Sequence, residues 1–116
     1  MGITEVTQHT FEEEVLGAKV PVMLLFTRQG DETCMQLEAV AEEVSQELSD
    51  QVKICKVDVD KEIMLALNYQ VLDLPLLVFM NYGIFQKRIT GTPDKATILE
   101  TLQTLINLQS SQQISF

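Results

Sequence analysis

The chain has no tryptophan and only two cysteines, Cys34 and Cys55, among its 116 residues. Secreted modules of this size that depend on disulfides usually carry about four or more cysteines, so the chain does not look like one. Basic residues are also scarce, since eight Lys and Arg stand against 17 Asp and Glu and give a net charge of −9. Long-range repulsion from phosphate backbones and anionic lipid surfaces therefore argues against nucleic acid and membranes as partners.

Long apolar stretches are absent too. No run approaches the ~18 residues that a membrane helix needs, and residues 1–10 lack the basic and apolar segments of a secretory leader. The length suits one domain, and 46% hydrophobic with 22% charged residues is an ordinary globular composition. We expect a cytoplasmic, single-domain protein, with a monomer as the default state.

Hydrophobic patterns alternate between those of strands and those of helices. Strands are predicted near 3–6 and at 20–27, 52–58, 76–81 and 84–90; helices are predicted at 10–16, from the polar loop 28–33 to about 49, at 61–69, and after Asp94. Thr10 and Glu13 match a capping box at the first helix. This order predicts an α/β fold with a mixed sheet of four or five strands, parallel inside and antiparallel at one end, between four helices. The domain is expected to span 1–108, with 109–116 a frayed polar tail.

Four segments carry a family resemblance: TFEEEVLGAKVPVMLLF, VKICKVDVDKE, DLPLLVFMNYG and RITGTPDK. In this order and spacing they resemble the thioredoxin family from about Ile3 to Leu108. The resemblance implies the thioredoxin-like fold and places a cis-proline at Pro75.

The resemblance also locates the family's Cys-Gly-Pro-Cys motif. Counted from Phe26 without gaps, it falls on Asp31-Glu32-Thr33-Cys34, so only the second cysteine is present. In disulfide exchange the first cysteine attacks as a thiolate and the second resolves the mixed disulfide. Asp31 replaces that nucleophile and cannot form a mixed disulfide, which predicts the loss of dithiol chemistry.

A second departure concerns proton transfer. Thioredoxins bury an aspartate in the central strand opposite a lysine on the neighbouring strand, and these positions correspond here to Leu25 and Lys56. A leucine avoids the cost of burying a carboxylate when no proton needs to be moved. Lys56 then needs another partner or a route to water.

The resemblance further implies a groove that binds an extended segment of a protein partner, with no cofactor. Its expected residues are Gly30, Asp31, Glu32, Thr33, Leu74, Pro75, Gly91 and Thr92. Two functions remain open from the sequence: a thioredoxin-like module that binds a partner in this groove in a redox-related context, and a single-thiol oxidoreductase that acts through Cys34.

Several residues have simpler interpretations. Asp31 is either a catalytic acid or, as we favour, the N-cap of the long helix. Cys34 is either a reactive thiol or a buried helix residue, and Cys55 is expected in the core, away from Cys34. His9 is expected at the surface, and Asp58, Asp60 and Glu62 in a solvated loop rather than a metal site. Four methionines at 23, 35, 64 and 80 are expected to fill the core.

Overall fold

Five strands alternate with helices along residues 2–114, the part of the chain that the computed structural model describes, with side chains through residue 108. In chain order the elements are β1 (Thr4–Glu5), the π-helical turn η1 (Glu12–Leu16), β2 (Val22–Thr27), α1 (Glu32–Leu48), the 3-10 turn η2 (Ser49–Gln51), β3 (Lys53–Asp58), α2 (Ile63–Asn68), β4 (Leu76–Asn81), β5 (Ile84–Thr90) and α3 (Lys95–Ile114). None of the helices within these residues is long and apolar enough to cross a membrane.

The strands form one mixed sheet in the order β1-β3-β2-β4-β5. β3 runs parallel to both β1 and β2, whereas β4 is antiparallel to β2 and pairs with β5 in an antiparallel hairpin. This arrangement confirms the predicted α/β fold, with parallel inner strands and an antiparallel end.

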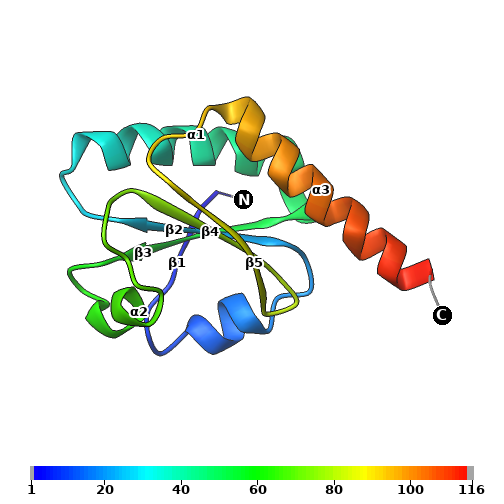
Figure 1. Ribbon diagram of the computed structural model, residues 1–116, viewed down its shortest axis with the longest axis horizontal. Coiled ribbons are helices and arrows are strands. Elements are labelled where there is room, and N and C mark those ends of the chain that lie inside the picture. The colour runs from blue at the N-terminus through cyan, green and yellow to red at the C-terminus, as the bar shows by residue number, and fades with distance from the viewer. Residues whose placement is uncertain (1, 115–116) are drawn as a thin grey trace.

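Helices cover both faces of the sheet, with α1 and α3 on one side and η1 and α2 on the other (Figure 1). Because successive side chains of a strand point to opposite faces, β2 supplies both cores and is buried along its whole length. Met23 and Leu25 pack beneath α1 and α3, and Leu24 and Phe26 pack beneath α2 and η1. The two layers of core hold the ends of β2 and β3 in place, and the candidate site lies at those ends.

The first helical turn differs from its prediction. The Thr10 hydroxyl accepts a hydrogen bond from the amide of Thr7 at 2.9 Å, and η1 begins after Phe11 with no side-chain cap. The predicted capping box between Thr10 and Glu13 is therefore wrong. The preceding turn uses the threonine hydroxyl, which a capping box would need for the helix.

The last helix is longer than expected. α3 continues to Ile114, although the polar residues from 109 onward were expected to lie beyond it as a frayed tail. Residues 109–114 contain neither glycine nor proline, so no residue there interrupts the helical hydrogen bonds. The last two residues of that tail, 115 and 116, lie outside the described residues.

Candidate functional site

Asp31 is the N-cap of α1, as the sequence favoured. Its backbone is extended, and its Oδ1 accepts a hydrogen bond from the amide of Cys34 at 2.9 Å. The hydrogen bonds from the Cys34 amide, and then from the Cys34 side chain, lower the pKa of the Asp31 carboxyl below its ordinary value. Asp31 is therefore ionised at neutral pH, which suits a cap or an electrostatic contact and not a proton donor.

Both cysteines are free and buried. Cys34 lies in the first turn of α1, whereas Cys55 lies on β3 in the core cluster that faces α2 and η1. Burial raises the pKa of the Cys55 thiol to about 11. The burial of Cys55 in this cluster confirms that it is a core residue, and because both cysteines are free, it is not joined to Cys34. In this conformation neither cysteine side chain is open to an attacking or a leaving sulfur.

Lys56 has a carboxylate partner that the sequence reasoning missed. Lys56 and Leu25 are register partners on β3 and β2, so the expected pairing of these positions is present. The partner is Glu38 of α1, whose Oε1 accepts a hydrogen bond from Lys56 Nζ at 3.2 Å. Its Oε2 accepts a second hydrogen bond from the Thr27 hydroxyl at 3.1 Å.

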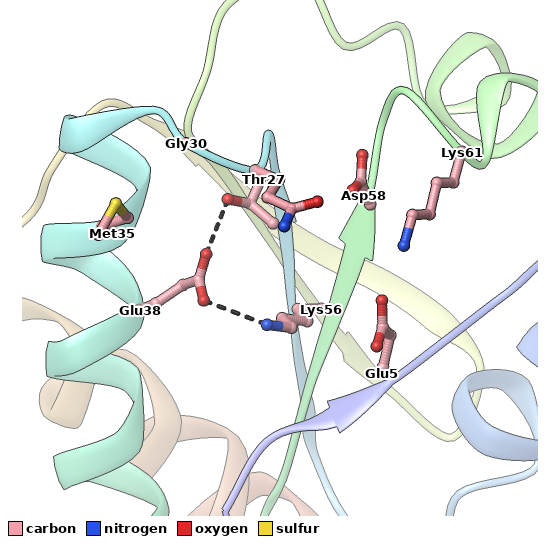
Figure 2. A pocket seen from close by; sticks show the side chains of 9 residues that line it. Glu5, Thr27, Gly30, Met35, Glu38, Lys56, Asp58 and Lys61 are labelled. Atoms are coloured by element: carbon pink, nitrogen blue, oxygen red, sulfur yellow. Dashed lines mark hydrogen bonds and ion pairs between the residues drawn. The ribbon is translucent and has the colours of Figure 1, made fainter.

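Figure 2 shows this carboxylate reaching from α1 to both strands. The negative charge opposite Lys56 therefore comes from the helix, because Leu25 on the strand has none to offer. One sequence signal could have pointed to it. Glu38 lies four residues after Cys34, and side chains at that spacing share one helix face.

The cluster of Lys56, Glu38 and Thr27 forms part of a pocket of about 500 Å³. Its other lining residues are Glu5, Gln29, Gly30, Met35, Asp58 and Lys61 (Figure 2). Met35 is 58% exposed, so its predicted place in the core is wrong. The buried stripe of α1 runs through Cys34 and Leu37, and Met35 points about 100° away from Cys34 around the helix.

The other methionines divide in the same way. Met23 and Met80 are buried, as predicted, on the central strands β2 and β4. Met64 is 51% exposed on α2, so its predicted burial is wrong. α2 is a helix of six residues that buries Leu65 alone, and Ile63, Met64 and Leu67 are each more than half exposed.

The second part of the site is the loop that enters β4. The peptide bond between Leu74 and Pro75 is cis, as expected. The carbonyl of Pro75 accepts a hydrogen bond from the amide of Gly91 at 2.9 Å, which ties the end of β5 to this loop. Gly91 has φ +97°, a conformation that favours glycine, although an added Cβ would meet no atom within 4 Å.

A separate hollow of about 390 Å³ lies between the start of α1 and this loop. Its lining residues are Arg28, Asp31, Val59, Ala66, Val71, Leu72, Asp73 and Leu74. Asp31 and Leu74, which the sequence assigned to one groove, therefore border the same space. Arg28 is already engaged, because its guanidinium donates to both carboxylate oxygens of Asp60 at 3.0 and 3.3 Å. These bonds raise the pKa of Arg28.

The remaining predicted groove residues outside the Pro75 loop do not line this hollow. Gly30 lines the pocket of Figure 2, with φ +85° at the turn before α1. Glu32 and Thr33 are exposed on the first turn of α1, and Thr92 is exposed beside Gly91.

The acidic side chains at the end of β3 and in the loop after it make hydrogen bonds within the protein. Asp58 accepts a hydrogen bond from the amide of Asp60, and Glu62 accepts one from the amide of Gln8 at 2.8 Å. Within residues 2–114, no three His, Cys, Asp or Glu side chains are grouped so that they could hold a metal ion. His9 is exposed, as expected, and borders a shallow hollow beside η1.

Comparison with known proteins gives a consistent result. The family described as Thioredoxin matches residues 2–104. Thioredoxin 1 of Synechococcus elongatus is 33% identical over 97 residues, which cover 84% of this chain and 91% of that protein. Thioredoxin of Mycolicibacterium smegmatis is 33% identical over 99 residues, covering 84% and 88%.

Solved structures agree at the level of the fold. A mutant thioredoxin from Halobacterium salinarum superposes with a TM-score of 0.82 at 22% identity, covering 90% of this chain and 91% of that one. Chloroplastic thioredoxin z also gives a TM-score of 0.82, at 20% identity, with 90% and 95% covered.

Proposed function

The chain belongs to the thioredoxin family, and from that premise we propose that it binds an extended segment of a partner protein in the groove beside Pro75, without dithiol exchange. The groove consists of Asp31, Leu74, Pro75 and Gly91. Asp31 and Leu74 line the hollow at the start of α1, and Pro75, next to Leu74, is joined to Gly91 by a backbone hydrogen bond. Binding of this kind uses the thioredoxin fold to recognise a partner and requires no chemical reaction with it.

The absence of a nucleophile supports this proposal most directly. Counted from Phe26, the position of the attacking cysteine is Asp31, whose carboxylate is engaged as the N-cap of α1. A carboxylate forms no mixed disulfide, so the first step of dithiol exchange has no attacking group. The remaining sulfur near the groove belongs to Cys34, which is buried.

The main chain of Leu74 supports the binding half of the proposal. Within the described residues, its N–H and C=O make no hydrogen bond to the rest of the protein. Backbone groups left open at an extended loop can pair with an added strand, as in other modes of peptide recognition. The neighbouring hydrogen bond between Pro75 and Gly91 keeps both walls of the groove at a fixed separation.

The test compares partners captured by immobilised wild-type protein with those captured by the double variant Leu74→Ser, Gly91→Ala. Open space around Gly91 lets the alanine fit, and its positive φ costs about 1 kcal/mol, so the variant should fold. The control is Ile84→Ser, which changes an exposed residue at the start of β5.

Partners of the groove should disappear with the double variant, remain with the control, and elute without a reducing agent. If every partner stays bound to the double variant, the groove is not the binding surface and the proposal is wrong. Circular dichroism of each variant verifies that the fold is intact.

A single-thiol oxidoreductase is the alternative, favoured by the place of Cys34 in the first turn of α1, a location where reactive cysteines of other proteins are found. The burial of Cys34 argues against this alternative and for the binding module. Alkylation of Cys34 should be measured against pH in a Cys55→Ala background. A midpoint no lower than that of a free thiol, ~8.5, with no glutathione adduct, would remove the alternative.

A further inference from the structure

The segment from α2 to the loop before Pro75 carries four exposed large apolar side chains. Ile63, Met64, Leu67 and Leu72 are each more than half exposed, and Leu72 is 90% exposed. We call these four residues the α2 patch. Ile63 and Leu67 share one helix face, and Leu72 lines the hollow together with Ala66 of the same helix. Exposed apolar groups gathered in this way are typical of a surface that binds another molecule.

The hollow beside the patch has a mixed lining, in which apolar side chains lie next to charged ones. Val71, Leu72 and Leu74 supply apolar side chains, and Asp31 and Asp73 supply carboxylates. The one cation of the lining, Arg28, is balanced by its two hydrogen bonds to Asp60. Two carboxylates are therefore left to interact with whatever enters the hollow.

These carboxylates differ in their surroundings but act in the same direction. Asp31 is held at the start of α1 and ionised at neutral pH, since its pKa is lowered by hydrogen bonds from Cys34. Asp73 is exposed, and no ion pair or side-chain hydrogen bond engages its carboxylate within the described part of the chain. A carboxylate has about four lone-pair sites, so Asp31 can cap the helix and still accept from a second donor.

We propose that the hollow and the α2 patch select an extended segment in which an apolar side chain is next to a lysine or arginine. This inference rests on the proposed function and names the chemistry of its partner. The apolar side chain fills the hollow over Val71 and Leu72, and the basic group reaches Asp31 or Asp73.

The overall charge favours the same occupant. With a net charge of −9 the protein attracts basic segments at long range and repels acidic ones. A second copy of this chain carries the same charge, so it is a poorer occupant of the patch than a basic partner.

The probes are three acetylated and amidated ten-residue peptides with a central leucine in a serine and threonine background. Lysine, glutamine or glutamate flanks the leucine on both sides, and binding is measured by fluorescence anisotropy. The lysine peptide should bind about tenfold more tightly than the glutamate peptide at low salt, with the glutamine peptide between them. The ratio should shrink in ~0.5 M salt, because the Debye length there is about 4–5 Å and exposed charges farther apart than this are largely screened.

Variants separate the charge from the apolar contact. Asp73→Asn and Asp31→Asn should each lower the ratio of lysine to glutamate affinity by about two- to threefold. Asparagine is as good an N-cap as aspartate, so Asp31→Asn removes the charge without removing the cap. Leu72→Ser should weaken all three peptides alike. Asp50→Asn, on the exposed η2 turn, is the matched control and should leave the ratio unchanged.

The outcomes distinguish the inference from the function beneath it. Equal affinity for the three peptides, lost on Gly91→Ala, would overturn the charge selection and leave groove binding intact. No binding by any peptide would overturn the inference; the proposed function falls with it only if partner capture is also insensitive to Gly91. A concentration-dependent dimer in sedimentation, abolished by Leu72→Ser, would assign the patch to a second copy and also overturn the inference.

Discussion

Replacing Glu38 by glutamine tests whether the carboxylate from α1 holds the helix to the sheet. Glu38 joins α1 to β3 through Lys56 and to β2 through Thr27. Glutamine keeps the shape of the side chain and can still accept the hydrogen bond from Thr27. The change therefore removes mainly the ion pair and leaves Lys56 beneath α1 without its charged partner.

The size of the effect follows from the burial of the pair. Breaking an exposed pair costs ~0.2–1 kcal/mol, and breaking a fully buried one costs ~3–5 kcal/mol. The side chains of Lys56 and Glu38 are 32% and 26% exposed, between these limits. We expect Glu38→Gln to lower the free energy of unfolding by about 1–2 kcal/mol. For a domain of this size that corresponds to about 4–8 °C in Tm.

Urea unfolding followed by far-UV circular dichroism measures the change, since the chain lacks tryptophan as a fluorescent probe. A double-mutant cycle with Lys56→Met isolates the pair, and its coupling energy should be about 1 kcal/mol. Glu43→Gln removes a more exposed contact of the same helix to Lys95 and should change the midpoint little. A coupling energy below about 0.3 kcal/mol, or equal losses for Glu38→Gln and Glu43→Gln, would refute the reasoning.

Three further predictions concern the cysteines and the core. Burial raises the pKa of the Cys55 thiol from 9.0 to about 11, so the unfolded state deprotonates first and stability falls between those pH values. The stability difference from Cys55→Ala in urea should change by up to about 2–3 kcal/mol from pH 8 to 11, and a constant difference would contradict this. Asp31→Cys should form a disulfide with Cys34 that mass spectrometry detects and a reductant reverses; its absence under oxidation would show that the start of α1 lacks the family's geometry. Leu25→Ala should cost about 3–4 kcal/mol in urea unfolding, because Leu25 is fully buried, and a loss below about 1 kcal/mol would contradict that packing.

The two strands β2 and β4 were predictable because they are buried on both faces. Their continuous apolar runs are visible in the sequence without any knowledge of the neighbours. The cap at Asp31 was predictable for a related reason. An N-cap depends on the residue itself and the next three positions, so a local pattern contains all of it.

Most of the features that the sequence reasoning missed depend on contacts between different elements of the fold. The partner of Lys56 is 18 positions away on another element, and only the height of α1 above the sheet brings Glu38 within 3.2 Å. Met35 and Met64 were misplaced because an apolar residue on a helix is buried only where another element covers that face. Thr10 failed as a cap because Thr7, three residues earlier, already binds its hydroxyl.

The burial of both thiols bears on how this surface would respond to its surroundings. Cys34 and Cys55 are enclosed by the fold, so neither thiol is exposed at the groove. In the proposed binding mode, no exposed thiol would couple partner binding to the redox state of the surroundings.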